Sequence, residues 1–294
     1  MRDGTPSRTA QWVAAARAFG MTLPESVRIA DDPYGIAFTS PSLQRLFAQA
    51  APRSLAAVPG LRTWIAYMQV RTRVLDDAIR EFVAGGGRQV VLLGAGYDCR
   101  ALRMGELADA RVYEVDHPAT QSHKRDVLDR IGALSPAVYV TWDFETRPMD
   151  ELPDTLADAG HDPSVPTITI WEGVTMYLTE GAIDASLRAI AAWSSPGSHL
   201  AMTYFAKSRL TKPSFATRVV QATVARLGEP WKFGWVPEEL PEYLSVRGFQ
   251  LARDISTPDA ARELLPAELA RTVRRADSHV AIAIAQESIL IAQR

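Results

Sequence analysis

The chain has 294 residues, of which 47% are hydrophobic and 22% are charged, and its formal net charge is -2 at pH 7. This composition suffices for a sizeable hydrophobic core and gives no electrostatic bias toward nucleic acid or another polyanion. The single cysteine, Cys99, excludes an internal disulfide framework and a cysteine-rich metal site. No apolar run approaches the ~20 residues of a membrane span, and the N-terminus lacks a signal-like apolar core. We therefore expect a cytoplasmic protein with neither a nucleic-acid nor a membrane partner.

Residues 1–87 are expected to form an N-terminal helical cap. An amphipathic helix is predicted from about Thr9 to Phe19, and a longer helix from about residue 61 to residue 83. Prolines interrupt the short segments between these helices, and the glycines at 85–87 end the long one.

The long helix carries one charged side chain on its apolar face. Spacings of three and four residues place five side chains on a single stripe: Trp64, Met68, Leu75, Ile79 and Phe82. Arg71 falls on that stripe, and an unpaired buried guanidinium is very costly. Its partner is predicted to be either a carboxylate of a bound ligand or a carboxylate of the protein core. Arg73 lies on the polar face, where an ion pair with Asp77 accounts for it.

The segment from 88 to 117 contains the pattern of a nucleoside-binding unit. Residues 90–93 are apolar and begin with two β-branched valines, as in a central parallel strand. Gly94, Ala95 and Gly96 follow at once, so the backbone can turn tightly and a ligand can approach it closely. Asp116 ends the second apolar run, where its carboxylate can accept hydrogen bonds from a ribose diol. The alternative is a tight turn with an ordinary helix cap.

Two departures from the dinucleotide fingerprint narrow the choice of cofactor. The third small residue of that motif is replaced by Cys99, and Asp98 at the start of the next helix would repel a pyrophosphate. The same aspartate could cap backbone N–H groups or meet an ammonium group. No Lys-Ser/Thr pair follows the glycines, so a nucleotide-phosphate loop is absent. S-adenosylmethionine, which has ribose and amino groups but no phosphate, fits better than NAD.

From residue 88 the pattern alternates between strands and helices. Strands are expected near 89–93, 111–116, 137–142, 166–171 and 198–205, and helices near 98–104, 118–131, 149–158 and 179–193. Alternation of this kind predicts right-handed βαβ units and a parallel sheet, so 88–205 is assigned as an α/β cofactor-binding core.

The remaining residues divide into two further regions. Residues 206–247 contain two helical stretches around an aromatic, proline-rich segment and are assigned as a helical insertion or lid. Residues 248–294 carry strand-like runs at 249–255 and 279–292, which would complete the core sheet.

Other enzyme chemistries lack their signatures. No histidine pairs with another at metal-ligand spacing, and neither HxxxH nor CxxC occurs, so no metal site is expected. The turn after the first strand is GAGYD rather than G-x-S-x-G, which argues against a serine hydrolase of the α/β type.

Several of these motifs together resemble the leucine carboxyl methyltransferase family, including its bacterial S-adenosylmethionine-dependent O-methyltransferases of secondary metabolism. LLGAGYDCRALRM followed by VYEVDHP carries the resemblance most clearly. Four further segments extend the resemblance: YMQVRTRVLDD at 67–77, WDFE at 142–145, WEGVTMYL at 171–178 and GEPWKFGWVPEELPEYLSVRGF at 228–249. The resemblance implies a Rossmann-like class I methyltransferase fold, with a seven-stranded, mostly parallel sheet completed by an antiparallel arrangement of the last two strands.

The resemblance also implies roles for residues around the cofactor. Arg71 would clamp the methionine carboxylate, and Arg17 matches a basic position near an N-terminal cofactor contact, although a solvated surface charge explains Arg17 as well. Asp143 would accept from the adenine amino group with Phe144 near the ring, unless Asp143 is only a cap or turn residue. Glu172 would lie near the ammonium and sulfonium end of the cofactor.

The sequence identifies the residues that would bind the methyl acceptor less clearly. Tyr177 could position the acceptor, but core packing explains an aromatic there equally well. An aromatic cluster would line a substrate pocket or lid, or else form a satellite cluster beneath a loop: Trp231, Phe233 and Trp235. The oligomeric state is left open.

The predicted activity is therefore S-adenosylmethionine-dependent O-methyl transfer to a small-molecule acceptor. A carboxylate, giving a methyl ester, is the first choice, because it is already ionised at neutral pH and needs no general base. The alternatives are transfer to a hydroxyl or phenol, for which a histidine would be the candidate base, an NAD-dependent oxidoreductase, and a non-catalytic binding module.

Overall fold

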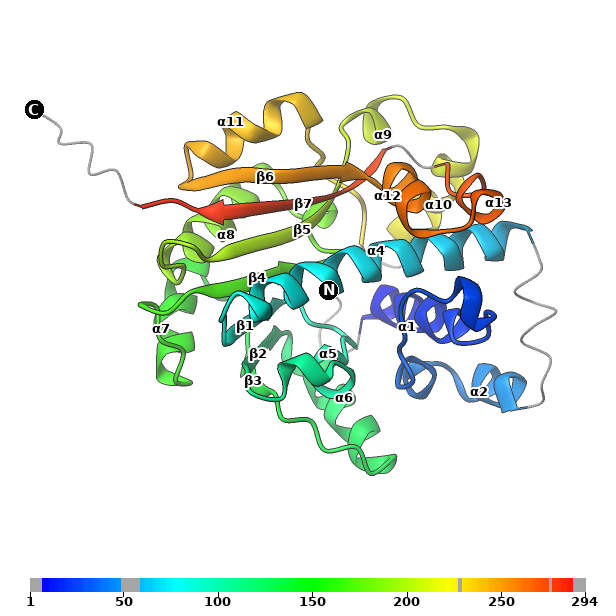
Figure 1. The fold of residues 1–294 in the computed structure, drawn as a ribbon, viewed down its shortest axis with the longest axis horizontal. Coiled ribbons are helices and arrows are strands. Elements are labelled where there is room, and N and C mark those ends of the chain that lie inside the picture. The colour runs from blue at the N-terminus through cyan, green and yellow to red at the C-terminus, as the bar shows by residue number, and fades with distance from the viewer. Residues whose placement is uncertain (1–6, 49–58, 227–228, 275–276, 288–294) are drawn as a thin grey trace, which may run out of the picture.

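A seven-stranded sheet with helices packed on it organises the described part of the chain (Figure 1). The computed structural model describes residues 7–48, 59–226, 229–274 and 277–287. The strands are β1 (Gln89–Leu93), β2 (Arg111–Asp116), β3 (Val138–Thr141), β4 (Thr167–Trp171), β5 (His199–Phe205), β6 (Phe249–Ser256) and β7 (Ser278–Ala285). Their order is β3-β2-β1-β4-β5-β7-β6. Strands β1 to β5 are parallel and β7 is antiparallel to both of its neighbours, which confirms the predicted sheet.

The last strand is shorter than predicted. The sequence pattern indicated a strand over 279–292, but β7 ends at Ala285, and residues 288–294 lie outside the described residues. Ala285 is the last residue of β7 with a partner on β6, opposite Phe249. Gly248, which precedes Phe249, has φ of 83°, and the last backbone bond between the two segments in the described structure is the one that the N–H of Gln286 donates to the carbonyl of Gly248 at 2.9 Å.

The helices occur close to their predicted places. They are α1 (Arg8–Gly20), α2 (Pro41–Ala48), α4 (Pro59–Ala84), α5 (Arg100–Arg103), α6 (Pro118–Arg130), α7 (Leu152–Asp158), α8 (Glu180–Ala192), α9 (Ser208–Thr211), α10 (Phe215–Arg226), α11 (Leu240–Ser245), α12 (Thr257–Leu264) and α13 (Ala267–Ala270). Two expectations need correction. The helix expected at 98–104 is the four-residue α5, and the region 206–247 contains α9, α10 and α11 rather than two helical stretches.

Local capping explains where several of these helices begin. The side chain of Ser7 accepts from the backbone N–H of Ala10 at the start of α1, and Thr179 caps α8 in the same way. His117 caps α6, and Pro118 occupies the first helical position, where no backbone donor is needed.

One face of the sheet is covered by the long helix α4 together with α12. Val90 and Leu92 of β1 face this layer, whereas Val91 and Leu93 face the opposite one, as the alternation of a strand requires. The buried residues of this first layer include Val70, Val74, Leu75, Ala260 and Ala261. The helix α4, predicted as part of a cap, thus also supplies one side of the main hydrophobic core.

The opposite face is covered by α7, α8 and α11. Their fully buried side chains pack against the strands in one cluster, which includes Leu152, Leu156, Ile183, Leu187, Ile190, Leu240 and Leu244. All five residues of β1 and of β4 are buried, so the central strands are enclosed on both faces. This burial leaves the ends of the strands as the places where a ligand can reach them.

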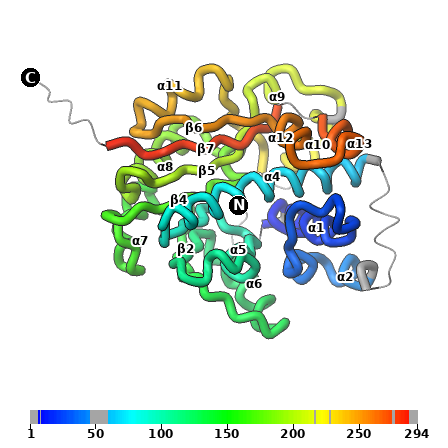
Figure 2. Tube along the Cα trace, in the orientation of Figure 1, coloured from blue at the N-terminus to red at the C-terminus, as the bar shows by residue number. Residues whose placement is uncertain are grey.

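The N-terminal helices lie against one end of α4. Figure 2 shows α1 and α2, in blue, beside the right-hand part of α4. Ala16 on α1 packs with Tyr67 and Met68 on α4. Gln69 donates to Ala30 O at 2.8 Å and accepts from the backbone N–H groups of Ile29 and Ala30 at 3.0 Å. These contacts fix α1 over the carboxyl ends of the strands.

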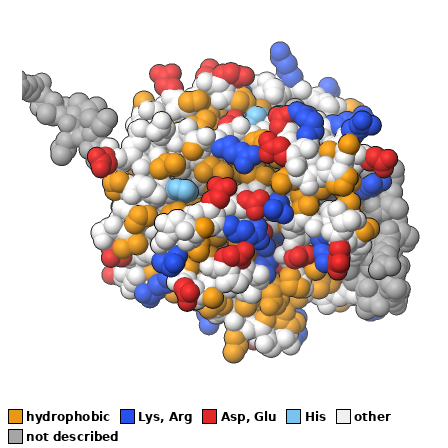
Figure 3. Space-filling model, viewed as in Figure 1, with side chains coloured by type: hydrophobic (Ala, Val, Ile, Leu, Met, Phe, Trp, Pro, Cys, Tyr) orange, Lys and Arg blue, Asp and Glu red, His pale blue; other side chains and the backbone are white. Residues whose placement is uncertain are grey.

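Acidic and basic side chains intermix on the face shown in Figure 3. Arg73 pairs with Asp77 at 2.7 Å, as predicted, and Arg80 pairs with Glu106 at 2.7 Å. Within the described residues, no helix has both the length and the apolar character that crossing a bilayer requires.

Candidate functional site

A cavity of about 400 Å³ lies beyond the carboxyl ends of β1, β2 and β4. This is the edge of a parallel sheet at which ligands bind, and the volume falls within the ~300–1,000 Å³ of small-molecule sites. Its wall comes from α1, from α4, from the turn after β1, and from the segments that follow β2, β3 and β4. The predicted site residues that line it are Arg17, Arg71, Gly94, Ala95, Gly96, Asp116, Asp143, Phe144, Glu172 and Tyr177.

The turn after β1 brings backbone to the cavity wall. Gly94 and Gly96 have φ of 71° and 52°, in the left-handed region that glycine adopts without a steric cost. A Cβ added at Gly94 would lie 2.6 Å from Cγ2 of Val174 on the segment after β4. Glycine is therefore required here both by backbone conformation and by close packing.

Asp116 is held in place by backbone donors at the tip of β2. Its Oδ2 accepts from the N–H of Gly96 at 2.5 Å, and its Oδ1 accepts from the N–H of His117 at 2.6 Å. Burial raises the pKa of Asp116, and these two backbone donors act in the opposite direction. The carboxylate is thus oriented at the cavity before any ligand binds.

Two further candidates lie at the tip of β3. Asp143 Oδ1 accepts from the N–H of Glu145 at 2.9 Å, and this bond lowers the pKa of Asp143. The turn role left open by the sequence is therefore present, and the same residue lines the cavity. Phe144 is partly buried beside it and packs against the sheet core.

Arg71 and Glu172, predicted separately, contact each other. Arg71 Nε donates to Glu172 Oε1 at 2.8 Å, and both side chains are less than a tenth exposed. The other carboxylate oxygen of Glu172 accepts from Arg100 at 2.8 Å. Burial alone would raise the pKa of Glu172, but the guanidinium groups of Arg71 and Arg100 hold it well below its ordinary value. Arg71 therefore has a protein carboxylate as its partner, and that carboxylate itself faces the cavity.

Arg17 is buried, so its interpretation as a solvated surface charge is wrong. It is 7% exposed, its Nε donates to Asp32 Oδ2 at 2.7 Å, and its Nη2 donates to the carbonyl of Tyr97 at 2.6 Å. The reason is the packing of α1 against α4 and the glycine turn, which directs this helix face inward. A second guanidinium is thus present on the cavity wall.

Sequence reasoning missed Arg100, the most buried of these arginines. Arg100 is 1% exposed and binds three carboxylates, those of Asp76, Asp98 and Glu172. Asp76 also accepts from Arg103 at 2.7 Å. A signal was present, because Asp76 lies beside Leu75 on the apolar side of the long helix and a buried acid there needs a cationic partner.

The far side of the cavity is formed by Tyr177, Glu229, Pro230 and Lys232. Burial raises the pKa of Tyr177 to about 12. Glu229 accepts from the hydroxyl of Ser7 at 3.2 Å. Lys232 lines the cavity, is exposed, and makes no ion pair with any described residue.

Trp231, Phe233 and Trp235 are not part of the cavity lining. Trp235 is 4% exposed and packs edge-on against Tyr204 and Phe233, and Trp231 packs on Phe205. The backbone N–H of Trp235 donates to the carbonyl of Phe205 at 3.1 Å, which holds this segment against the end of β5. Trp235 belongs to the hydrophobic core on the face of the sheet covered by α7, α8 and α11, and Phe233 packs against it, so the cluster is part of the main core rather than a satellite of it.

Among the described residues, no group of three or more His, Cys, Asp or Glu side chains could hold a metal ion. His117 is the histidine of the cavity lining, and its side chain accepts from the N–H of Ala119 at 3.2 Å as the cap of α6.

Comparison with known proteins matches the sequence to a family and the fold to solved structures. The model of the leucine carboxyl methyltransferase family matches residues 10–191. A candidate S-adenosyl-L-methionine-dependent methyltransferase of Streptomyces avermitilis is 35% identical over 70% of this chain and 74% of its own length. Another, of Frankia alni, is 34% identical over 65% of this chain and 66% of its own. The crystal structure of a candidate methyltransferase of Thermobifida fusca has a TM-score of 0.59 at 19% identity, with 97% of both chains covered, and shows the shared fold.

Proposed function

Because the chain belongs to the leucine carboxyl methyltransferase family, we propose that it transfers the methyl group of S-adenosylmethionine to a carboxylate oxygen of a small metabolite. S-adenosylmethionine dependence follows from the family, which sets aside the NAD-dependent oxidoreductase. The carboxylate acceptor is the proposal, and the observation that carries it is Lys232, a cation on the cavity wall that makes no ion pair with any residue the structure describes.

The nucleoside half of S-adenosylmethionine fits the wall formed by the turn after β1 and the tips of β2 and β3. Asp116 presents a fixed carboxylate for the ribose diol, and the glycine turn leaves room beside it. We assign the adenine to Asp143 and Phe144, which offer an acceptor for its amino group and a ring to pack on.

The amino-acid half of S-adenosylmethionine fits the charges on α1, α4 and the tip of β4. Two guanidinium groups, of Arg17 and Arg71, and two carboxylates, of Asp98 and Glu172, line the cavity. A zwitterion with one carboxylate and one ammonium group complements such a wall. We assign the methionine carboxylate to Arg71 with Arg17, and the ammonium to Glu172 with Asp98.

Catalysis by these residues consists of positioning. S-adenosylmethionine, when bound, supplies a methyl group activated by a sulfonium. A carboxylate acceptor is already a nucleophile at neutral pH, so the protein has to orient it and exclude water. Lys232 can pair with that carboxylate, and Tyr177, whose pKa is raised to about 12 by burial, stays protonated and can donate a hydrogen bond. We assign Tyr177 the positioning of the acceptor.

Transfer to a hydroxyl is the second candidate, favoured by Glu229. This carboxylate lines the cavity near Tyr177 and could accept a proton from an alcohol or phenol. It is already engaged by the hydroxyl of Ser7 at 3.2 Å. His117, the histidine of the cavity lining, follows β2 on the nucleoside side.

The acceptor class can be decided by the product. Aromatic and aliphatic monocarboxylic acids, and the matching phenols and alcohols, are incubated with S-adenosylmethionine carrying a labelled methyl group. We expect the acids to accept label, and mild alkali to release it as methanol, because methyl esters hydrolyse and methyl ethers do not. Alkali-stable product from the phenols alone, lost in Glu229→Gln, would establish the hydroxyl acceptor instead.

A matched pair of variants tests Lys232. Lys232→Met is expected to raise the KM for an acid acceptor about two- to fivefold, the factor for an exposed ion pair, without changing kcat. Lys207→Met, at an exposed lysine outside the cavity lining, should leave KM unchanged. Equal KM values in the wild type and both variants would remove the support for a carboxylate acceptor.

Asp116→Ala tests the nucleoside half of the site. Loss of hydrogen bonds between a charged group and the ribose should cost about 1.5–3 kcal/mol of S-adenosylhomocysteine affinity, measured by calorimetry. Thermal unfolding of the ligand-free variant serves as the control, because Asp116 also accepts from Gly96 and His117. An affinity within twofold of wild type would contradict the ribose assignment.

A further inference from the structure

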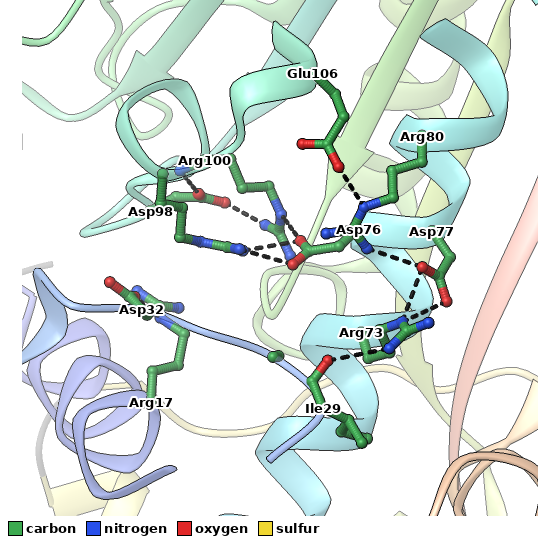
Figure 4. Close-up of polar contacts among 12 residues, drawn as sticks. Arg17, Ile29, Asp32, Arg73, Asp76, Asp77, Arg80, Asp98, Arg100 and Glu106 are labelled. Carbon is green, nitrogen blue, oxygen red and sulfur yellow. Dashed lines mark hydrogen bonds and ion pairs between the residues drawn. The ribbon is translucent and has the colours of Figure 1, made fainter. Parts of the chain in front are cut away.

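Arg100 connects three segments of the chain through their carboxylates. It is the first residue of α5, and Figure 4 shows it between Asp76 of α4 and Asp98 of the glycine turn. Its Nε donates to Asp76 Oδ1 at 2.7 Å, and its Nη1 donates to Asp98 and, at 2.8 Å, to Glu172 Oε2. Its backbone N–H donates to Asp98 Oδ1 at 2.8 Å. Arg100 itself is not part of the cavity lining.

Two of these three carboxylates face the cavity and the third does not. Asp98 and Glu172 belong to the lining, whereas Asp76 lies behind them. The ion pairs form one connected set of three arginines and three acids: Arg71, Glu172, Arg100, Asp98, Asp76 and Arg103. Formal charge within this set is balanced, as a buried cluster requires.

We propose that Arg100 is a positioning residue for the ammonium group of the cofactor's methionine moiety, because its hydrogen bonds hold the carboxylates of Asp98 and Glu172 in place on the cavity wall. The inference rests on the proposed function, since it takes S-adenosylmethionine as the ligand. Two carboxylates that face the same cavity repel each other unless a cation lies between them. Arg100 supplies that cation from behind the wall and leaves the cavity side of both acids free for a ligand.

The chemistry of the guanidinium explains why arginine occupies this position. Its planar fork presents several N–H donors in fixed directions, so one side chain can bind three carboxylates at once. A lysine would keep the charge but could not reproduce that geometry. Without the guanidinium, Asp98 and Glu172 would lose the donor that they share, and the wall would no longer present both carboxylates in fixed positions to an ammonium group.

The test compares two ligands that differ only in the amino-acid group. Calorimetry of the full chain measures the affinity for S-adenosylhomocysteine and for 5′-methylthioadenosine, which keeps the adenosine and the sulfur but has no ammonium or carboxylate. We expect Arg100→Met to weaken S-adenosylhomocysteine about tenfold or more and 5′-methylthioadenosine by less than about twofold. The ratio of the two affinities in Arg100→Lys should lie between the ratios in the wild type and in Arg100→Met.

Arg103→Met is the matched control. It removes another buried arginine that pairs with Asp76 at 2.7 Å, but Arg103 makes no ion pair with Asp98 or Glu172 in the described structure. We expect it to keep the wild-type ratio of the two affinities even where thermal stability falls. If Arg100→Met does not fold, the ratio in Arg100→Lys decides.

Each outcome bears on the inference. Equal losses for the two ligands in the Arg100 variants, or a change of ratio in Arg103→Met as large as that in Arg100→Met, would mean a structural role and overturn it. Wild-type affinities for both ligands in Arg100→Met would also overturn it and would leave the proposed function standing. A wild type that binds neither ligand would overturn the cofactor site together with the inference.

Discussion

Replacing Glu172 with glutamine is expected to lower the free energy of unfolding by about 3–5 kcal/mol, the cost of removing one partner from a buried ion pair. Glu172 lies between Arg71 and Arg100, and its side chain is 9% exposed. The amide keeps the volume but leaves the largely buried cluster with an excess positive charge. Urea denaturation followed by circular dichroism measures the change.

Asp77→Asn is the control for that prediction. Asp77 also contacts two arginines, Arg73 at 2.7 Å and Arg80 at 2.9 Å, but these side chains are a third or more exposed. An exposed pair contributes roughly 0–1 kcal/mol, so the loss should be much smaller. Equal losses in the two variants would contradict the buried-network interpretation.

The same pair of proteins has an expected pH dependence. The pKa of Glu172 is lowered in the folded chain, so its contribution is present above the pKa of an unfolded glutamate and is lost as the pH falls below it. The difference in stability between wild type and Glu172→Gln should therefore be constant near neutral pH and shrink below about pH 4.3, the ordinary pKa of glutamate. A difference that grows on acidification would have the wrong sign.

Replacing Arg71 with lysine is expected to weaken S-adenosylhomocysteine binding about tenfold or more, because the lysine keeps the charge but loses the bidentate fork. Arg71 already uses Nε for Glu172 at 2.8 Å, and a single ammonium group cannot serve that acid and a ligand carboxylate in the same way. A decarboxylated analogue of the ligand, which has no anion for Arg71, should lose little affinity. Calorimetry with both ligands measures the difference.

Arg73→Lys, two residues along α4 and partly exposed, is the control for Arg71→Lys and should leave both affinities unchanged. If Arg71 served only as a structural partner of Glu172, then Arg71→Lys would weaken both ligands by the same factor and lower the melting temperature of the ligand-free chain. That result would remove Arg71 from the carboxylate site.

The ion pair of Arg71 with Glu172 makes the two interpretations of Arg71 compatible with each other. The sequence presented a ligand clamp and a structural ion pair as alternatives. In the folded chain the protein partner is itself a cavity residue, so the pair can hold both side chains in place for a zwitterionic ligand. Its buried charges are therefore arranged before a ligand binds, which lowers the cost of binding.

The structure also gives a physical reason for the absence of the third small residue of the dinucleotide fingerprint. Cys99 is 1% exposed and packs with Tyr97 and Phe38. The helix that follows it, α5, has only four residues. Such a short helix has little dipole and few free N–H groups to offer a pyrophosphate, so a small residue for close helix packing is not required.

The sequence by itself determined the features that depend on neighbouring residues. The alternation of apolar strands with helical segments predicted the parallel sheet, because side-chain periodicity is a local property. The glycine turn and Asp116 were also predictable, since the turn needs residues that accept positive φ and the acid follows one βα unit later. Ends of elements were less accurate, as the early end of β7 at Ala285 shows, because a strand stops where its partner stops.

Only the tertiary structure decided what the buried charges contact. Arg71 and Glu172 are separated by 101 residues, and Arg17 and the carbonyl it binds by 80, so no local pattern specifies these pairs. The face of α1 that carries Arg17, the central position of Arg100 and the inward packing of Trp235 all depend on how distant segments meet. Charge pairing and ring packing are properties of assembled surfaces, and they appear only when the segments that supply them have come together.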